Sequence, residues 1–201
     1  IEKPVTITVN NFEDDNIEAD LFFFVNLSNP TGKASIADNQ GTCTIFDNDA
    51  TTASITAADP AASETGPDSG RFTVSLDGNK LAPPGGVVVT YSVGGTAETG
   101  GADYTALAGS VTIPGFTSAA TIFVVPVNDA VVEADETVTV TLDGTDNGDV
   151  TINSAADTDT VTIADNDATT VSIAAADASA AEAGPDPGQF TVSLDGAKVA
   201  P

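Results

Sequence analysis

One stretch of this sequence occurs twice, and the distance between its copies limits what the chain can fold into. IFDNDATTASI at residues 45–55 returns as IADNDATTVSI at residues 163–173, which is 118 positions later because 163 − 45 = 118. Residues 50–83 align with residues 168–201 without a gap, and 24 of these 34 positions are identical. Similarity this high over a domain-sized period predicts tandem modules of one type, spaced too widely for a solenoid.

The repeat divides the chain into three predicted units. Residues 50–167 form one complete repeat. Residues 1–49 form the C-terminal half of a preceding repeat, because TITVNNFEDDNIEADLFFFVNL is similar to TIFVVPVNDAVVEADETVTVTL in the complete one. Residues 168–201 correspond to the N-terminal strands of a following repeat. We therefore expect the chain to be a segment of a longer array.

Apolar residues alternate with polar ones along most of the complete repeat. This period of two, often with threonine on the opposite face, is typical of half-buried β-strands. The alternating apolar positions are Phe72, Val74, Leu76, Val87, Val89, Val111, Ile113, Ile122, Val124, Val138, Val140, Leu142, Val161 and Ile163. Turn-forming sequences such as LDGN, PPGG and IPGF separate the strands. About seven short strands per unit predict an all-β chain of tandem immunoglobulin-like antiparallel β-sandwiches.

Two local features need predictions of their own. Residues 55–70 are rich in alanine, but Pro60, Gly66 and Gly70 interrupt them, so we expect an extended loop rather than a helix. Cys43 aligns with the apolar position Val161, so we expect its side chain in the core of the first unit. Without a histidine in the chain, a nucleophilic role for this thiol has no support.

The chain is strongly acidic, with 30 acidic and 5 basic residues, no histidine and a formal charge of −25. Nucleic acid and anionic membranes are excluded as partners, because both are bound through clustered lysine and arginine. No stretch approaches the length of an apolar membrane span, so we expect no transmembrane helix. High acidity often serves solubility alone. The positions of the acids decide between that role and cation binding.

Eight acidic residues of the complete repeat fall in loops that an antiparallel sandwich can bring to one end. They are Glu64, Asp103, Asp129, Glu133, Asp135, Glu136, Asp165 and Asp167. Two carboxylates about 4 Å apart repel by roughly 4 kcal/mol at an effective dielectric near 20, so such a group needs protons or cations. Oxygen ligands without histidine select a hard ion, and the flexible coordination of Ca²⁺ fits them better than the strict octahedron of Mg²⁺.

Three motifs of the complete repeat resemble a known family. GTAETGGADY resembles the GTA–GxDY stretch of Calx-beta domains, VNDAVVEADETVTVTL resembles their DD–x–E–x–DE segment, and TIADND resembles their terminal aspartate cluster. The resemblance covers the complete repeat and both partial flanks. It implies a Ca²⁺-binding β-sandwich of the kind found in sodium–calcium exchangers, integrin β4 and large bacterial surface proteins.

The resemblance also implies which residues bind the ion. In the complete repeat the ligands fall on Glu64, Asp103, Asp129, Glu133, Glu136, Asp165 and Asp167, with a backbone carbonyl from Val131; Asn128 stands where the family often has aspartate, and Asp135 is either a ligand or the support of one. In the first unit they fall on Glu13, Asp14, Asp15, Glu18, Asp47 and Asp49. Leu21 replaces the last glutamate there, which predicts a weaker site. Because Asn128 and Ala130 replace acids, we expect two ions in the complete repeat.

These properties favour a structural role. We expect a calcium-binding, calcium-rigidified structural or adhesive segment of a long extracellular repeat protein or fibre at the cell surface. Its partners are calcium ions and adjacent repeats of the same or neighbouring chains, and a surface glycan or protein receptor stays open. The alternative is a calcium-sensing regulatory module of a membrane transporter. Paired carboxylates can hydrolyse glycosides, but only 5% of residues are aromatic and could form a sugar platform, so we expect no enzyme.

Overall fold

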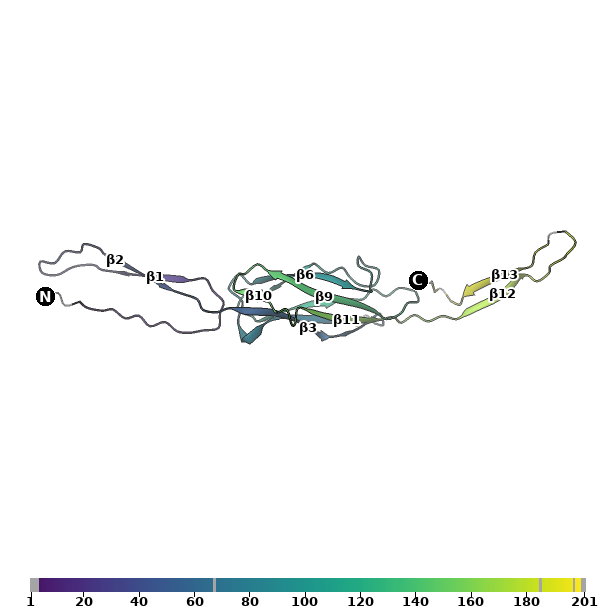
Figure 1. Ribbon diagram of the computed structural model, residues 1–201, viewed down its shortest axis with the longest axis horizontal. Coiled ribbons are helices and arrows are strands. Elements are labelled where there is room, and N and C mark those ends of the chain that lie inside the picture. Colours follow the sequence, from purple (N-terminus) through teal and green to yellow (C-terminus); the bar gives the residue numbers. More distant parts are fainter. Residues whose placement is uncertain (1–3, 67, 185, 197, 200–201) are drawn as a thin grey trace.

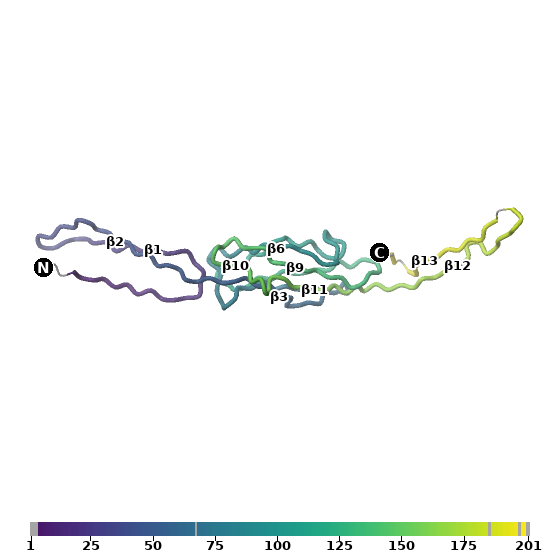
Figure 2. Tube along the Cα trace, viewed as in Figure 1, coloured from purple at the N-terminus to yellow at the C-terminus, as the bar shows by residue number. Residues whose placement is uncertain are grey.

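The computed structural model describes residues 4–66, 68–184, 186–196 and 198–199, and predictions for other positions lie outside the described residues. Within these ranges there is no α-helix, and the 3-10 turn η1 (Asp77–Asn79) is the one helical element. None of the described helical structure is long and apolar enough to cross a bilayer. Figure 1 shows a β-sandwich in the middle of an elongated chain, with a two-stranded unit on either side. The Cα trace in Figure 2 follows the same path.

Two sheets make up the central sandwich. The four-stranded sheet has the order β10 (Val150–Ile152), β3 (Thr51–Asp59), β5 (Gly70–Leu76) and β8 (Ala119–Val124). The five-stranded sheet has the order β4 (Ala61–Ser63), β11 (Thr158–Ala164), β9 (Glu136–Thr145), β6 (Val87–Gly95) and β7 (Ser110–Ile113). Most pairs are antiparallel, while β10–β3 and β11–β4 are parallel. The predicted all-β, immunoglobulin-like sandwich is confirmed.

The core of the sandwich consists of the alternating apolar positions. Phe72 and Val74 on β5 are fully buried, and so are Val138 and Val140 on β9, in one cluster with residues of the other strands. The intervening polar residues stay outside the core; the hydroxyl groups of Thr139 and Thr160, for example, lie 2.9 Å apart across β9 and β11. The period-two pattern therefore predicted both faces of these strands correctly.

The alanine-rich segment differs from its prediction. Residues expected to form an extended loop belong to β3 as far as Asp59 and to β4 after it. Pro60 separates the two strands, and β3 pairs in one sheet while β4 pairs with β11 in the other. The Pro60 carbonyl accepts a 2.8 Å hydrogen bond from the Thr162 amide, which holds the crossing point. Proline lacks the N–H that a continuous ladder needs, so it marks where the chain changes sheet.

One carboxylate fastens the first strand of the sandwich to the turn after β5. Asp77 accepts hydrogen bonds from the hydroxyl of Ser54 at 2.7 Å, the amide of Asn153 at 3.1 Å and the hydroxyl of Thr52. Burial opposes ionisation of this carboxyl, but the hydrogen bonds outweigh it and lower the pKa of Asp77. Asp195 holds Thr170 and Ser172 in the same way in the C-terminal unit.

The flanking units repeat parts of the central one. Strands β12 (Val171–Asp177) and β13 (Gln189–Leu194) pair in the register of β3 and β5, with a bulge at the corresponding residues. On the N-terminal side, β1 (Leu21–Asn26) pairs with β2 (Gln40–Ile45). The unit boundaries 1–49, 50–167 and 168–201 stay a prediction.

Cys43 corrects one expectation. Its side chain is exposed rather than in a core. The reason is that β1 and β2 form a two-stranded sheet, and no second sheet covers it among the described residues.

Candidate metal centre

The acidic loops of the central repeat meet at the end of the sandwich where β4 and β11 finish. Glu64 directly follows β4, and its amide donates a 3.2 Å hydrogen bond to the Ala164 carbonyl at the end of β11. Asp165 and Asp167 follow β11. Because β4 and β11 run parallel, side by side, both strands deliver their carboxylates to the same edge.

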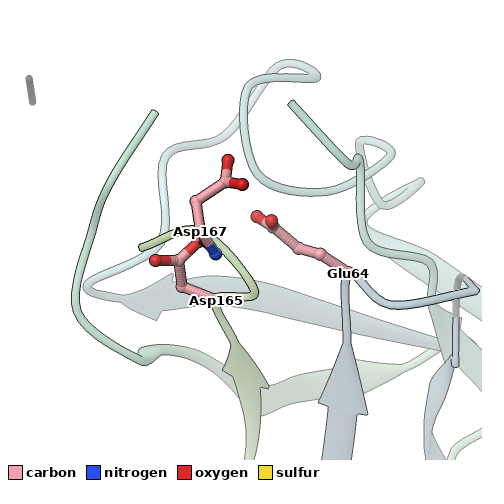
Figure 3. A group of neighbouring side chains, drawn as sticks. All are labelled: Glu64, Asp165 and Asp167. Atoms are coloured by element: carbon pink, nitrogen blue, oxygen red, sulfur yellow. Dashed lines mark hydrogen bonds between the residues drawn. The ribbon is translucent and has the colours of Figure 1, made fainter. Parts of the chain in front are cut away.

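Glu64, Asp165 and Asp167 form the first carboxylate group. One carboxylate oxygen from each residue lies within 4.8 Å of the others. Figure 3 shows the Glu64 side chain turned toward the two aspartates across the ends of their strands. Glu64 is only 5% exposed and Asp167 9% exposed. Three carboxylates so close, with two of them buried, repel one another strongly unless a cation lies among them.

Two oxygens of this group have no hydrogen-bond partner among the described residues. Glu64 Oε2 and Asp167 Oδ2 are buried and accept no hydrogen bond from the described residues. Burial, and then the charges of Asp165 and Asp129, raise the pKa of Glu64. Buried carboxylate oxygens are normally paired, and an unpaired one is costly. A positive charge beside these two oxygens would offset that cost.

Asp103, Glu133 and Glu136 form the second carboxylate group, again with ligand oxygens within 4.8 Å of one another. Asp103 lies between β6 and β7 and is buried, Glu133 lies in the loop between β8 and β9, and Glu136 begins β9. Burial first, and then the neighbouring Asp103, raise the pKa of Glu136 to about 7. Burial and the charges of Asp103 and Asp129 also raise the pKa of Glu133.

Backbone hydrogen bonds tie the two groups together. Asp165 accepts from the Glu133 amide at 3.1 Å and from the Asp167 amide at 3.0 Å, so it links the β8–β9 loop to the segment after β11. Asp129 accepts from the Val131 amide at 2.7 Å, which fixes the start of that loop. The side chain of Asp129 is exposed, and its charge acts on both Glu64 and Glu133.

Four residues implied by the resemblance lie outside both groups, and the exposed Asp129 is one of them. Asn128 and Asp135 are exposed. Val131 takes part in a parallel β-bridge with Val199 of the following unit. Their roles as ligands stay predictions.

Five of the six predicted ligands of the first unit line one pocket without closing into a group, and Asp15 is not among them. Glu13, Asp14, Glu18, Asp47 and Asp49 lie around it. The loop bonding matches the central repeat, since Asp47 accepts from the Glu18 amide at 3.0 Å as Asp165 accepts from Glu133. Among the described residues of this unit, however, no three carboxylate oxygens come as close as in the central repeat.

Two lysines at the acidic ends were missed by sequence reasoning. Lys80 forms ion pairs with Asp49 and, at 3.0 Å, with Asp15, and hydrogen bonds to these carboxylates raise the pKa of Lys80. Lys198 forms an ion pair with Asp167. Each lysine belongs to the unit that follows the aspartate in the chain. The sequence did contain a signal for them: a lysine stands at the same position in LDGNK and LDGAK, although the chain has only five basic residues.

The residues present fit Ca²⁺. Both groups offer oxygen ligands only, and two buried oxygens of the first group have no hydrogen-bond partner in the part of the chain that the structure describes. A flexible shell of carboxylate and carbonyl oxygens suits Ca²⁺ better than a transition metal. A bound Ca²⁺ would neutralise the repulsion within each group and connect loops from β4, β6, β8 and β11.

One family model and several solved structures are similar to this chain. The Calx-beta domain family matches residues 2–60 and 47–167. Among solved structures, the apo form of the Calx CBD1 domain is 18% identical over 59% of this chain and all of that chain, with a TM-score of 0.46. CBD12 from CALX1.2 is 23% identical over 58% of this chain and 45% of that chain, with a TM-score of 0.44. The comparison with curated proteins gives no match.

The family match rests on sequence and covers most of the chain, including both carboxylate groups. It agrees with the three motifs that suggested the same family. Calx-beta domains are calcium-binding modules rather than catalytic ones. The chain belongs to the Calx-beta domain family.

Proposed function

We propose that this chain is a calcium-stabilised structural segment of a long extracellular repeat protein. The observation that carries the proposal is the pair of carboxylate groups at one end of the sandwich. Within the described ranges, Glu64 Oε2 and Asp167 Oδ2 are buried without a hydrogen-bond partner. The ligands come from four loops, so an ion there holds the whole end of the sandwich together. If free Ca²⁺ stands about 100-fold above its Kd, each site adds roughly 2.7 kcal/mol of stability.

The repetition of the joint between units supports the structural role. The chain around Asn16 bridges to Leu81, and the chain around Val131 bridges to Val199 at the corresponding positions. Two joints of one geometry suit an array with regular spacing. Secretion, adhesion and filament formation are parts of the proposal, as is a glycan or protein receptor at the surface.

A second candidate is a regulatory module of a membrane transporter that senses intracellular Ca²⁺. It is supported by the family alone, since Calx-beta domains also occur in sodium–calcium exchangers. Affinity separates the two candidates. Sensors bind Ca²⁺ at about 10⁻⁷–10⁻⁵ M and extracellular modules at about 10⁻⁴–10⁻³ M.

The test is calorimetric titration of the chain with Ca²⁺, beside thermal unfolding with and without chelator. We expect millimolar-range binding and a chelator-induced fall in Tm. Asp165→Ala combined with Asp167→Ala should abolish most of that fall. The matched control is Asp157→Ala, since Asp157 precedes β11 at the opposite end of the strand and lies outside both carboxylate groups. Micromolar or tighter binding would favour the sensor, and an unchanged Tm on chelation would refute calcium stabilisation.

A further inference from the structure

The acidic end of each unit is also the place where the next unit attaches. Two backbone hydrogen bonds make the first joint, from the Ile17 amide to the Leu81 carbonyl at 3.1 Å and from the Leu81 amide to the Asp15 carbonyl at 2.9 Å. The second joint has the same pair, from Val132 to Val199 at 3.0 Å and from Val199 to Ala130 at 2.9 Å. In both joints the residues just before a glutamate of one unit, Glu18 or Glu133, form backbone hydrogen bonds with the next unit. Their partner there is the residue that follows the lysine after the LDG turn.

The residue before each bridge is a lysine that reaches into the acidic end. Lys80 precedes Leu81 and pairs with Asp49, whose side chain is 5% exposed. Lys198 precedes Val199 and pairs with Asp167, whose side chain is 2% exposed. These aspartates are the corresponding last residues of the two IxDND sequences. The ammonium groups thus pair with Asp167 of the first carboxylate group and with Asp49, its counterpart in the first unit.

A carboxylate that binds two cations at once brings them close together, and the two cations then repel each other. Asp167 belongs to the group with Glu64 and Asp165, and its Oδ1 pairs with Lys198. Its other oxygen, Oδ2, is buried and has no hydrogen-bond partner among the described residues. A divalent ion held by this group would lie within a few ångströms of the ammonium. Like charges at that separation, in a site with little water, repel strongly.

We propose that the acidic end of each unit is a docking surface for the lysine of the next unit, and that Ca²⁺ competes with that lysine for the terminal aspartate. Without Ca²⁺ the lysine is the counter-ion, and it anchors the following unit. With Ca²⁺ bound the lysine is displaced, so the joint changes its side-chain contacts while the backbone bridge stays. The inference rests on the proposed calcium site and adds a coupling between ion binding and the joint.

The two joints should differ in strength. Lys80 has two carboxylate partners, Asp15 and Asp49. Lys198 has one among the described residues, because Ala130 stands where the first joint has Asp15. Competition by Lys80 should therefore be the stronger.

The experiment uses the whole chain and three single variants, Lys80→Met, Lys198→Met and Lys33→Met. Methionine keeps an unbranched apolar stem and removes the charge. Lys33→Met is the matched control, since Lys33 is exposed between β1 and β2 and forms no ion pair among the described residues. Calorimetric titration with Ca²⁺ measures affinity, and circular dichroism checks folding of each variant. Removal of one nearby positive charge should tighten Ca²⁺ binding. We expect Lys198→Met to increase the Ca²⁺ affinity of the central repeat about fivefold, and Lys80→Met to increase that of the first unit about tenfold.

A second readout measures the geometry of the first joint directly. Cys43 is the one cysteine of the chain and is exposed, so a spin label on it pairs with a second label at Thr112→Cys, an exposed position on β7. In chelator we expect a narrow distance distribution between the labels for the wild-type lysines and a broader one for Lys80→Met. Adding Ca²⁺ should shift the wild-type distribution.

The outcomes separate this inference from the proposed function. If no variant binds Ca²⁺, the proposed calcium site is wrong, and the competition fails with it. If the chain binds Ca²⁺ and both lysine variants titrate like Lys33→Met, the site stands and the competition is refuted. Weaker binding in Lys198→Met would refute it as well, since the lysine would then support the ion site.

Discussion

Glu136 offers a quantitative test of how the acidic end behaves without calcium. Burial, the contact with Asp103 and the charges of Glu133 and Glu98 raise its pKa from 4.5 to about 7. A raised pKa means that the folded chain holds the proton more tightly than the unfolded chain does. In chelator the resulting stability is therefore fully present below pH 4.5 and is lost as the pH rises to about 7. The shift of 7 − 4.5 = 2.5 pH units corresponds to roughly 3 kcal/mol.

Glu136→Gln cannot ionise and should keep that free energy at high pH. In chelator at pH 8 we expect the variant to be more stable than the wild type by about 2–3 kcal/mol, with a flatter pH dependence between 4.5 and 7. Urea unfolding at several pH values measures this. The two tyrosines of the chain, Tyr91 and Tyr104, are both buried in the central sandwich, and there is no tryptophan, so intrinsic fluorescence reports on that unit.

The control is Asp157→Asn, which removes a carboxylate outside both groups and should leave the pH dependence as in the wild type. In saturating Ca²⁺ we expect Glu136→Gln to be less stable than the wild type, because the variant has lost a charged ligand. The reasoning is refuted if the variant is no more stable than the wild type in chelator at pH 8, or if both lose stability in parallel between pH 4.5 and 7.

Three further predictions concern the scaffold. Asp77→Ala removes the acceptor of three hydrogen bonds and should lower the free energy of unfolding by about 2–3 kcal/mol in urea at pH 7. Because the pKa of Asp77 is lowered, this loss should shrink as the pH falls through that pKa. An equal loss at all pH values would show that the ionised carboxylate is not what stabilises this turn. Gly95 has a φ of 117°, and Gly95→Ala would place a methyl group 2.1 Å from the Thr137 carbonyl oxygen. We therefore expect destabilisation by at least about 2 kcal/mol. A Tm within roughly 2 °C of the wild type would contradict this prediction. Phe72→Ala in the closed core should cost about 3–5 kcal/mol, and a loss under roughly 1 kcal/mol would show that the core is not close-packed there.

The strands of the central repeat could be predicted because burial repeats every two residues along them. Phe72 and Val74 or Val138 and Val140 show this pattern directly in the sequence. The acidic end was also predictable in outline, since antiparallel connections must return loops to shared ends. The shared end of the loops does not by itself determine which carboxylates group together. The division into Glu64 with the two aspartates, and Asp103 with two glutamates, depends on side-chain directions at strand ends.

The failures have physical reasons as well. Pro60 and the glycines after it predicted a loop, whereas Pro60 only separates two strands. Alanine has a low strand propensity, and tertiary packing places these alanines in strands. Cys43 occupies an apolar position by alignment, yet its exposure depends on whether a second sheet covers it. The lysines were missed because a partner about 30 residues away in another unit leaves no local periodicity.

The most direct test of the account is a crystal structure of this chain grown in abundant Ca²⁺, with anomalous scattering to locate the ions. We expect one ion bound by Glu64, Asp165 and Asp167 and another bound by Asp103, Glu133 and Glu136, with Lys198 turned away from Asp167. A map in which both positions lack an ion, with those carboxylates directed apart into solvent, would contradict it.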